Sequence, residues 1–189
     1  MWKTFDCEKV VDFILYGMTL SDRIKRALPK DSINKPDLLA VFAQGHLLKE
    51  IVQELSKPFH GKVDCVISPE AVGWVVGAAV ATELGVPFIG ARKLGNLPYA
   101  REAFYHCEKV VLAAYTDYSG REKVIEITRD SMPKSWVLTP EGRKVPSAAR
   151  VLIVDDWTDT GAGINACRVL IEKLNGTVIG AVTIKDLLN

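Results

Sequence analysis

Short apolar runs alternate with helix-forming stretches along this chain, and this alternation is what most limits the folds open to it. The apolar runs at residues 63–68 and 86–91 flank a Gly- and Ala-rich stretch at 73–84, which Gly85 ends. A short apolar run between turn signals predicts a strand buried on both faces. A strand, a helix and a second strand in succession predict a parallel βαβ unit.

The C-terminal part repeats this pattern. Residues 150–154 predict a strand, residues 164–174 a helix and residues 177–184 a last strand; the helix carries Cys167, Leu170, Ile171 and Leu174 on one face. Two such units predict an α/β fold, a mostly parallel sheet with helices on both faces. Ligands of such sheets bind at the carboxyl ends of the strands.

The segments outside these units are less regular. Residues 109–116 and 123–128 predict an antiparallel strand pair, and the polar stretch 133–149 predicts a loop. Short helices are expected at 10–15 and 21–28, followed by a polar joint at 29–37 and a longer helix that Asp37 caps. We therefore divide the chain into a small N-terminal helical hood, residues 1–36, and a core domain, residues 37–189.

Composition excludes several classes of protein. The 189 residues hold 24 Lys+Arg and 23 Asp+Glu, so no bulk charge attracts nucleic acid or a membrane, and anion binding has to be local. The most apolar stretch, 71–81, is far shorter than the roughly 20 residues that span a bilayer, and acidic residues interrupt the N-terminus. We expect a cytoplasmic protein. Its cysteines and histidines lack metal-ligand spacing, so we expect reduced thiols and no zinc site.

The segment VLIVDDWTDTGAG, residues 151–163, carries the chemistry. A buried strand delivers Asp155 and Asp156 to its carboxyl end, and a small-residue turn then opens a helix. Backbone N–H groups from Thr160 to Gly163 would bind an anion, and the carboxylates would suit vicinal hydroxyls. This pattern predicts a ribose 5-phosphate site. The alternative is a solvated strand end followed by a helix cap.

The same segment resembles the phosphoribosyl-pyrophosphate signature of type I phosphoribosyltransferases. The resemblance extends from about residue 37 to 185. Residues 68–93 resemble the pyrophosphate-loop helix and the strand that ends in Arg-Lys. GNLPY, from Gly95, and YTDYSGREKVIEI, from Tyr115, are similar to the mobile hood-side loop of purine members. The signature is specific for the superfamily and much weaker for the base.

The resemblance implies a type I phosphoribosyltransferase fold and a Mg²⁺-dependent transfer of ribose 5-phosphate from phosphoribosyl pyrophosphate to a purine base, by a homodimer. It assigns the ribose hydroxyls to Asp155 and Asp156, and the 5-phosphate to Thr158, Asp159, Thr160, Gly161, Ala162 and Gly163. Pyrophosphate would meet Ala71, Val72, Arg92 and Lys93. Magnesium would be held mainly by substrate oxygens and water, without a direct protein ligand.

Four positions depart from the family pattern. Ala162 and Gly163 stand where the family loop commonly continues Gly-Thr, so one hydroxyl donor is missing. Adenine-specific members usually have arginine at the place of Val72 and a basic residue at that of Asn96. Weaker pyrophosphate binding or a different sub-branch would follow.

The sequence says least about which base accepts the ribose 5-phosphate. Asp159 resembles the aspartate that exchanges a proton with the purine ring in hypoxanthine-guanine enzymes, although it would also serve as a loop cap. Lys185 resembles the lysine that meets an exocyclic oxygen; Asn34 and Trp157 are further candidates for base contacts. GNLPY and Asp117 before Tyr118 resemble adenine enzymes instead. We favour a 6-oxopurine slightly over adenine, because a lysine donor suits a carbonyl.

Two other functions compete with purine transfer. A phosphoribosyl-pyrophosphate-binding regulator without catalysis would explain the altered loop, but the N-terminal residues look unlike a DNA-binding element. Orotate transfer is disfavoured because DYSGREKVIEI, residues 117–127, resembles purine members.

Overall fold

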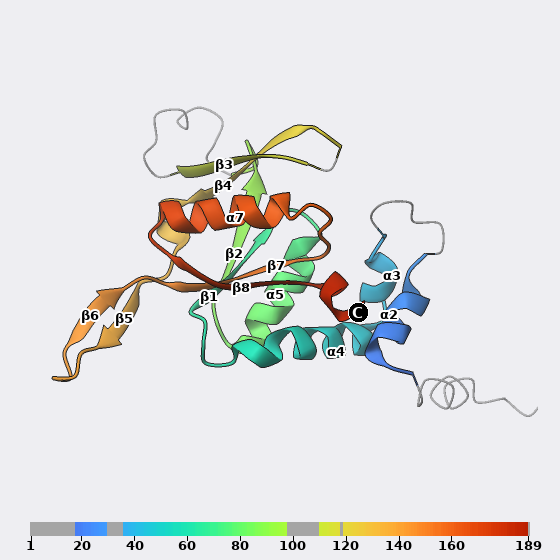
Figure 1. Ribbon diagram of the computed structural model, residues 1–189, viewed down its shortest axis with the longest axis horizontal. Coiled ribbons are helices and arrows are strands. Elements are labelled where there is room, and N and C mark those ends of the chain that lie inside the picture. Colours follow the sequence, from blue (N-terminus) through green and yellow to red (C-terminus); the bar gives the residue numbers. More distant parts are fainter. Residues whose placement is uncertain (1–17, 30–35, 98–109, 118, 189) are drawn as a thin grey trace, which may run out of the picture.

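A six-stranded sheet forms the centre of the computed structural model, which describes residues 18–29, 36–97, 110–117 and 119–188. The strand order is β3-β4-β2-β1-β7-β8 (Figure 1). β1 (Cys65–Pro69), β2 (Phe88–Lys93), β7 (Arg150–Asp155) and β8 (Thr177–Thr183) are parallel. β3 (Val110–Thr116) and β4 (Glu122–Thr128) pair antiparallel and join the sheet beside β2. The predicted α/β class with a mostly parallel sheet is confirmed.

Helices cover both faces of the sheet, as predicted. α4 (Gly45–Ser56) and α5 (Gly73–Leu84) lie on one face, and α7 (Ala162–Lys173) lies on the other (Figure 1). Neighbouring residues of β1 therefore enter different cores: Val66 packs in the cluster that includes α4 and α5, and Ile67 in the cluster that includes α7. Burial on both faces explains why these strands are continuously apolar.

The N-terminal helices differ in part from the prediction. α2 (Leu20–Ala27) confirms the helix expected near 21–28, and a capping box between Thr19 and Asp22 starts it. The single helix expected after Asp37 is instead two helices, α3 (Leu39–Phe42) and α4, because Gln44 leaves the helical region just before Gly45. The expected helix at 10–15 lies outside the described residues. The boundary between hood and core stays a prediction.

The stretch 133–149, expected to be a loop, contains a β-hairpin that projects from the body of the molecule (Figure 1). β5 (Ser135–Leu138) pairs antiparallel with β6 (Lys144–Ser147) across a turn in which Gly142 has a positive φ of 77°. Asp64 fixes the base of the hairpin: its carboxylate accepts hydrogen bonds from Ser135 Oγ at 3.0 Å and from the Arg150 backbone N–H at 2.7 Å.

Short 3-10 helices complete the described elements: η1 (Lys57–Phe59), η3 (Arg129–Ser131) and η4 (Ile184–Leu188). Within the described ranges, none of the helices combines the length and the apolar character needed to cross a membrane.

Candidate active site

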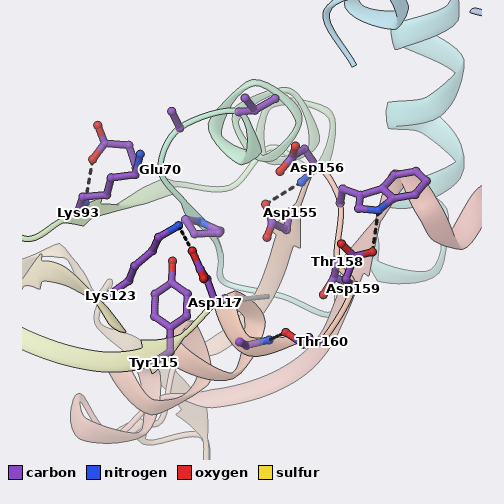
Figure 2. Close-up of a pocket in the computed structure, with 16 residues that line it drawn as sticks. Glu70, Lys93, Tyr115, Asp117, Lys123, Asp155, Asp156, Thr158, Asp159 and Thr160 are labelled. Carbon is purple, nitrogen blue, oxygen red and sulfur yellow. Dashed lines mark hydrogen bonds and ion pairs between the residues drawn. The ribbon is translucent and has the colours of Figure 1, made fainter. Parts of the chain in front are cut away.

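A pocket of about 330 Å³ opens where the parallel strands β1 and β7 end (Figure 2). This is the edge at which a sheet of this kind binds its ligands. The pocket is lined by the segment after β1, the end of β2, residues of β3 and β4 and the segment after β7: Pro69, Glu70, Ala71, Val72, Lys93, Tyr115, Asp117, Lys123, Asp155, Asp156, Trp157, Thr158, Asp159, Thr160, Ala162 and Gly163.

Asp155 and Asp156 lie at the end of β7 and are largely buried, with 9% and 3% of their surface exposed. The Asp156 backbone N–H donates to Asp155 Oδ1 at 2.8 Å. A β-carbon on Gly73, the first residue of α5, would lie 2.6 Å from Asp155 Oδ1, and one on Gly163 would lie 3.6 Å from Oδ2. The Asp155 carboxylate therefore sits against the first turns of α5 and α7, where helix dipoles favour a negative charge.

In the loop between β7 and α7, backbone N–H groups donate hydrogen bonds to threonine hydroxyls of the same loop. α7 begins at Ala162, two residues before the predicted start, with Gly161 as its N-cap at a φ of 73°. The Gly161 N–H donates to Thr158 Oγ1 at 2.9 Å, and the Ala162 N–H donates to Thr160 Oγ1 at 3.3 Å. These donors belong to the helix N-terminus, which is suited to an anion.

Lys185 in η4 holds the loop from outside the pocket. Its Nζ donates to the Thr158 carbonyl at 3.0 Å and lies 3.5 Å from Asp159 Oδ1. The same ammonium lies 5.5 Å from the centre of the Trp157 ring, whose indole N–H donates to Asp159 Oδ1 at 3.2 Å. Lys185, expected at the base, is thus engaged by the loop backbone and does not line the pocket.

On the opposite side, Glu70 joins the segments after β1 and β2. Its Oε2 accepts the Lys93 backbone N–H at 2.8 Å, and both of its oxygens accept from Asn96 Nδ2, at 3.1 and 3.0 Å. Burial raises the pKa of Glu70, but these hydrogen bonds and the charges of Lys93 and Arg92 together keep that pKa below its ordinary value. Ala71 and Val72 line the pocket beside Glu70, as expected for a loop that meets a ligand.

Arg92, which the resemblance assigns to pyrophosphate, does not line the pocket. Its guanidinium lies 4.9 Å from the centre of the Trp74 ring, and Nη1 donates to the Asn96 carbonyl at 3.4 Å. Adjacent residues of a strand point to opposite faces, so when Lys93 lines the pocket Arg92 has to point away from it.

A cluster on the β3–β4 hairpin lies in the segment that resembles purine members, but sequence reasoning assigned Lys123 and Tyr115 no role in the site. Lys123 Nζ lies 2.6 Å from Asp117 Oδ2, and Tyr115 stands directly opposite Lys123 in the antiparallel register. Hydrogen bonds from Lys123 and Ser119 hold the pKa of Asp117 far below its usual range, and burial raises the pKa of Tyr115. Opposite residues of an antiparallel pair share a face, so the predicted strand pair contained this signal.

Most of the expected site residues lie together in the pocket. The pocket brings together eleven of the expected site residues: Ala71, Val72, Lys93, Asp155, Asp156, Trp157, Thr158, Asp159, Thr160, Ala162 and Gly163. Gly161 lies at the N-terminus of α7, as its N-cap. Asn34 lies outside the described residues.

The chemistry of the pocket suits a magnesium ion that arrives with its ligand. In the part of the chain that the structure describes, no group of three or more His, Cys, Asp or Glu side chains could form a metal cage. Magnesium commonly takes one or two protein carboxylates and fills its other positions with phosphate oxygens and water. Asp155 and Asp156, the paired carboxylates of the pocket wall, would hold the water molecules of such an ion, and the ligand would supply its phosphate oxygens.

Comparisons with known proteins agree with this architecture. An adenine phosphoribosyltransferase of Leuconostoc citreum is 35% identical over 180 residues, covering 94% of this chain and 85% of the relative. One of Clostridium acetobutylicum is 31% identical over 173 residues, covering 90% and 87%. The solved adenine phosphoribosyltransferase of Thermoanaerobacter pseudethanolicus superposes with a TM-score of 0.68 at 29% identity, covering 87% of this chain and 86% of the other. No protein-family model matches the chain.

Proposed function

The chain belongs to the adenine phosphoribosyltransferase family of type I phosphoribosyltransferases, and from that premise we propose that its own base is adenine, converted with phosphoribosyl pyrophosphate to adenosine 5′-monophosphate and pyrophosphate. Membership makes it a pentosyltransferase that acts on phosphoribosyl pyrophosphate and a purine base. The relatives do not support the slight preference for a 6-oxopurine, since the Leuconostoc citreum and Clostridium acetobutylicum proteins are both adenine enzymes by name.

The main observation in favour of this function is the meeting of Asp155 and Asp156 with the first turn of α7 at one pocket. Paired carboxylates accept hydrogen bonds from the two hydroxyls of a ribose, and the helix N-terminus binds its 5-phosphate. In this assignment a phosphate oxygen replaces the hydroxyls of Thr158 and Thr160 as acceptor for the amides of Gly161 and Ala162.

The same assignment explains why the missing threonine is tolerated. The family loop commonly has a hydroxyl where Gly163 stands, but backbone amides do not depend on the side chain. A β-carbon at Gly163 would be in ordinary contact with Asp155 Oδ2, at 3.6 Å.

The argument for a 6-oxopurine weakens at Lys185. That argument requires a lysine ammonium directed at the base, whereas the Lys185 ammonium donates to the Thr158 carbonyl and lies beside Asp159. A lysine that holds the loop carries no preference between a carbonyl and an amine at the purine 6-position.

The transfer passes through an oxocarbenium-like state, in which the ribose carbon loses pyrophosphate as the ring nitrogen approaches. We assign to this chain the tasks of positioning both reactants, excluding water and stabilising the departing charge. Asp159 is our candidate for exchanging the ring-nitrogen proton; its Oδ1 is oriented by the Trp157 indole and by Lys185. Magnesium, bound with the substrate, would neutralise charge on the pyrophosphate oxygens.

The remaining proposals concern assembly. We propose that residues 1–36 form a hood and that the active form is a homodimer. α2 supports the first idea only in part, because its Ile24 is buried in the same cluster as α4 and α5.

One assay tests the base and the reaction together. The protein is incubated with phosphoribosyl pyrophosphate, Mg²⁺ and, separately, adenine, hypoxanthine, guanine, xanthine and orotate, and nucleotide formation is followed by chromatography. We expect adenosine 5′-monophosphate to form fastest. Faster turnover of another base would refute the adenine assignment, and binding of phosphoribosyl pyrophosphate without turnover of any base would identify a regulator.

A further inference from the structure

The charges around the pocket are out of balance for a ligand as anionic as pyrophosphate. Among the described residues that line it, the cations are Lys93 and Lys123, and the carboxylates are Glu70, Asp117, Asp155, Asp156 and Asp159. A departing pyrophosphate needs positive charge close to its oxygens. Arg92, the other cation expected there, lies over Trp74 instead. A second cation has to come from somewhere other than the end of β2.

We propose that Lys123 is that cation: it binds pyrophosphate and, when phosphoribosyl pyrophosphate enters, exchanges its ion pair with Asp117 for a pair with the phosphate oxygens. The inference rests on the proposed function and adds to it a binding residue that lies on β4, outside the segments that the family resemblance assigns to pyrophosphate.

The position of Lys123 in the sheet directs it into the pocket. Lys123, Ile125 and Ile127 alternate along β4, and the two isoleucines are buried in the cluster that includes α7. Alternate residues of a strand share a face, so Lys123 continues this face beyond the end of the core. There it meets Asp117 and Tyr115, and all three line the pocket (Figure 2).

The Asp117 carboxylate can release Lys123 without losing its own place. Its Oδ1 accepts the Ser119 N–H at 2.9 Å, Ser119 Oγ at 2.6 Å and the Arg121 N–H at 3.1 Å, which holds the turn between β3 and β4. The ion pair with Lys123 is made by the other oxygen, Oδ2. The exchange therefore leaves the turn intact.

The exchange is also favoured by charge. The Lys123 side chain is 39% exposed and can turn toward a ligand in the pocket, whereas the Asp117 side chain is 6% exposed and stays fixed in its turn. The terminal phosphoryl group of phosphoribosyl pyrophosphate carries more negative charge than a carboxylate, so its attraction for the ammonium is larger at the same distance.

Calorimetric titration of the full chain tests the proposal with two probes, magnesium pyrophosphate and ribose 5-phosphate. We expect Lys123→Met to weaken pyrophosphate binding by roughly 10-fold to 100-fold, the effect of losing one charge-assisted hydrogen bond. Ribose 5-phosphate, which does not occupy the pyrophosphate side, should bind within about twofold of the wild type. Lys123→Arg should restore most of the pyrophosphate affinity, and Lys144→Met, on the exposed strand β6, should bind both probes normally.

Unchanged pyrophosphate affinity in Lys123→Met would overturn the proposal, and so would a parallel loss for both probes, which would indicate a collapsed pocket. If the wild-type protein binds neither probe, the proposed function itself fails. A wild type that binds both, together with a Lys123→Met variant that binds both equally well, refutes the role of Lys123 alone.

Asp117→Asn provides a second test, in which Lys123 is retained and pyrophosphate affinity is expected to rise. The asparagine oxygen can still accept the hydrogen bonds of the turn, while the competing negative charge is gone. We expect pyrophosphate to bind several-fold more tightly to this variant, and most of the gain to disappear in the double variant with Lys123→Met. An equal gain in both backgrounds would contradict the exchange.

Discussion

Gly73 approaches Asp155 so closely that a β-carbon on the glycine would lie 2.6 Å from the carboxylate oxygen Oδ1. Atoms cannot stay at that distance, so any side chain at the start of α5 would displace the carboxylate that we assign to the ribose. The helix that follows β1 and the acidic pair that follows β7 are thus fitted to each other across the parallel strand pair.

The first prediction concerns this approach. Gly73→Ala should lower kcat/KM for phosphoribosyl pyrophosphate by at least about 10-fold, because Asp155 has to move, a cost of 1.4 kcal/mol or more in transition-state binding. Gly45→Ala is the matched control: Gly45 also begins a helix, but its β-carbon would have nothing within 4 Å. Steady-state kinetics should leave Gly45→Ala at the wild-type rate. Equal rates for the two variants would refute the coupling.

The second prediction concerns the acidic pair. The double variant Asp155→Asn, Asp156→Asn should lose at least about 1000-fold in turnover, since two charge-assisted hydrogen bonds to the ribose are lost together. Its circular dichroism spectrum should match that of the wild type. Asp130→Asn, at an exposed position in η3, serves as a control for loss of a carboxylate. Retained turnover in the double variant would remove the ribose assignment.

The third prediction separates two roles for Lys185. If Lys185 holds the loop through the Thr158 carbonyl, Lys185→Ala should weaken the binding of adenosine 5′-monophosphate and of inosine 5′-monophosphate by the same factor, roughly 3-fold to 10-fold. Fluorescence or calorimetric titration with each nucleotide measures this. A loss confined to the inosine nucleotide would place the ammonium at a 6-carbonyl, as the sequence suggested.

The fourth prediction is a pH dependence of stability. Hydrogen bonds from the Arg150 side chain lower the pKa of Asp64 below its ordinary value of 3.8. A lowered folded-state pKa stabilises the fold above 3.8, and this contribution is lost as the pH falls through the folded-state pKa. Asp64→Asn should therefore cost about 1–2 kcal/mol at pH 7 and progressively less in acid, measured by urea unfolding. A cost that is constant down to pH 2 would contradict the ion pair.

The fifth prediction concerns the buried thiols. Burial raises the pKa of Cys65 to about 12 and also raises the pKa of Cys167, so neither forms a reactive thiolate near neutral pH. After brief iodoacetamide treatment at pH 8, peptide mass spectrometry should find both unmodified in the native protein and both alkylated in urea. Native-state alkylation of either would show that its core opens readily.

The regular part of the fold was predictable because β1 and β7 are buried almost throughout and α5 ends at Gly85. The hairpin of β5 and β6 was not, because each strand is short, Pro146 interrupts one of them and most side chains are exposed. Its signal was local: two short segments separated by a turn with Gly142.

The site divides in the same way. Residues carried by one continuous segment, such as Asp155 and Thr160, could be placed from the sequence, whereas Lys123 depends on the pairing of β4 with β2 and β3. Arg92 lies over Trp74 and not in the pocket lining, because side chains in a strand alternate, and a sequence motif does not take this alternation into account.

The pairing of Cys65 with Val151 joins distant parts of the chain, and it brings the segments after β1 and β7 to one edge. Contacts of such long sequence separation form slowly, because a large loop has to close first. A nascent chain that has not yet acquired β7 therefore has no complete pocket. Substrate can stabilise only molecules in which β7 has paired with β1. Ligand binding therefore favours the finished fold over every earlier stage of its assembly.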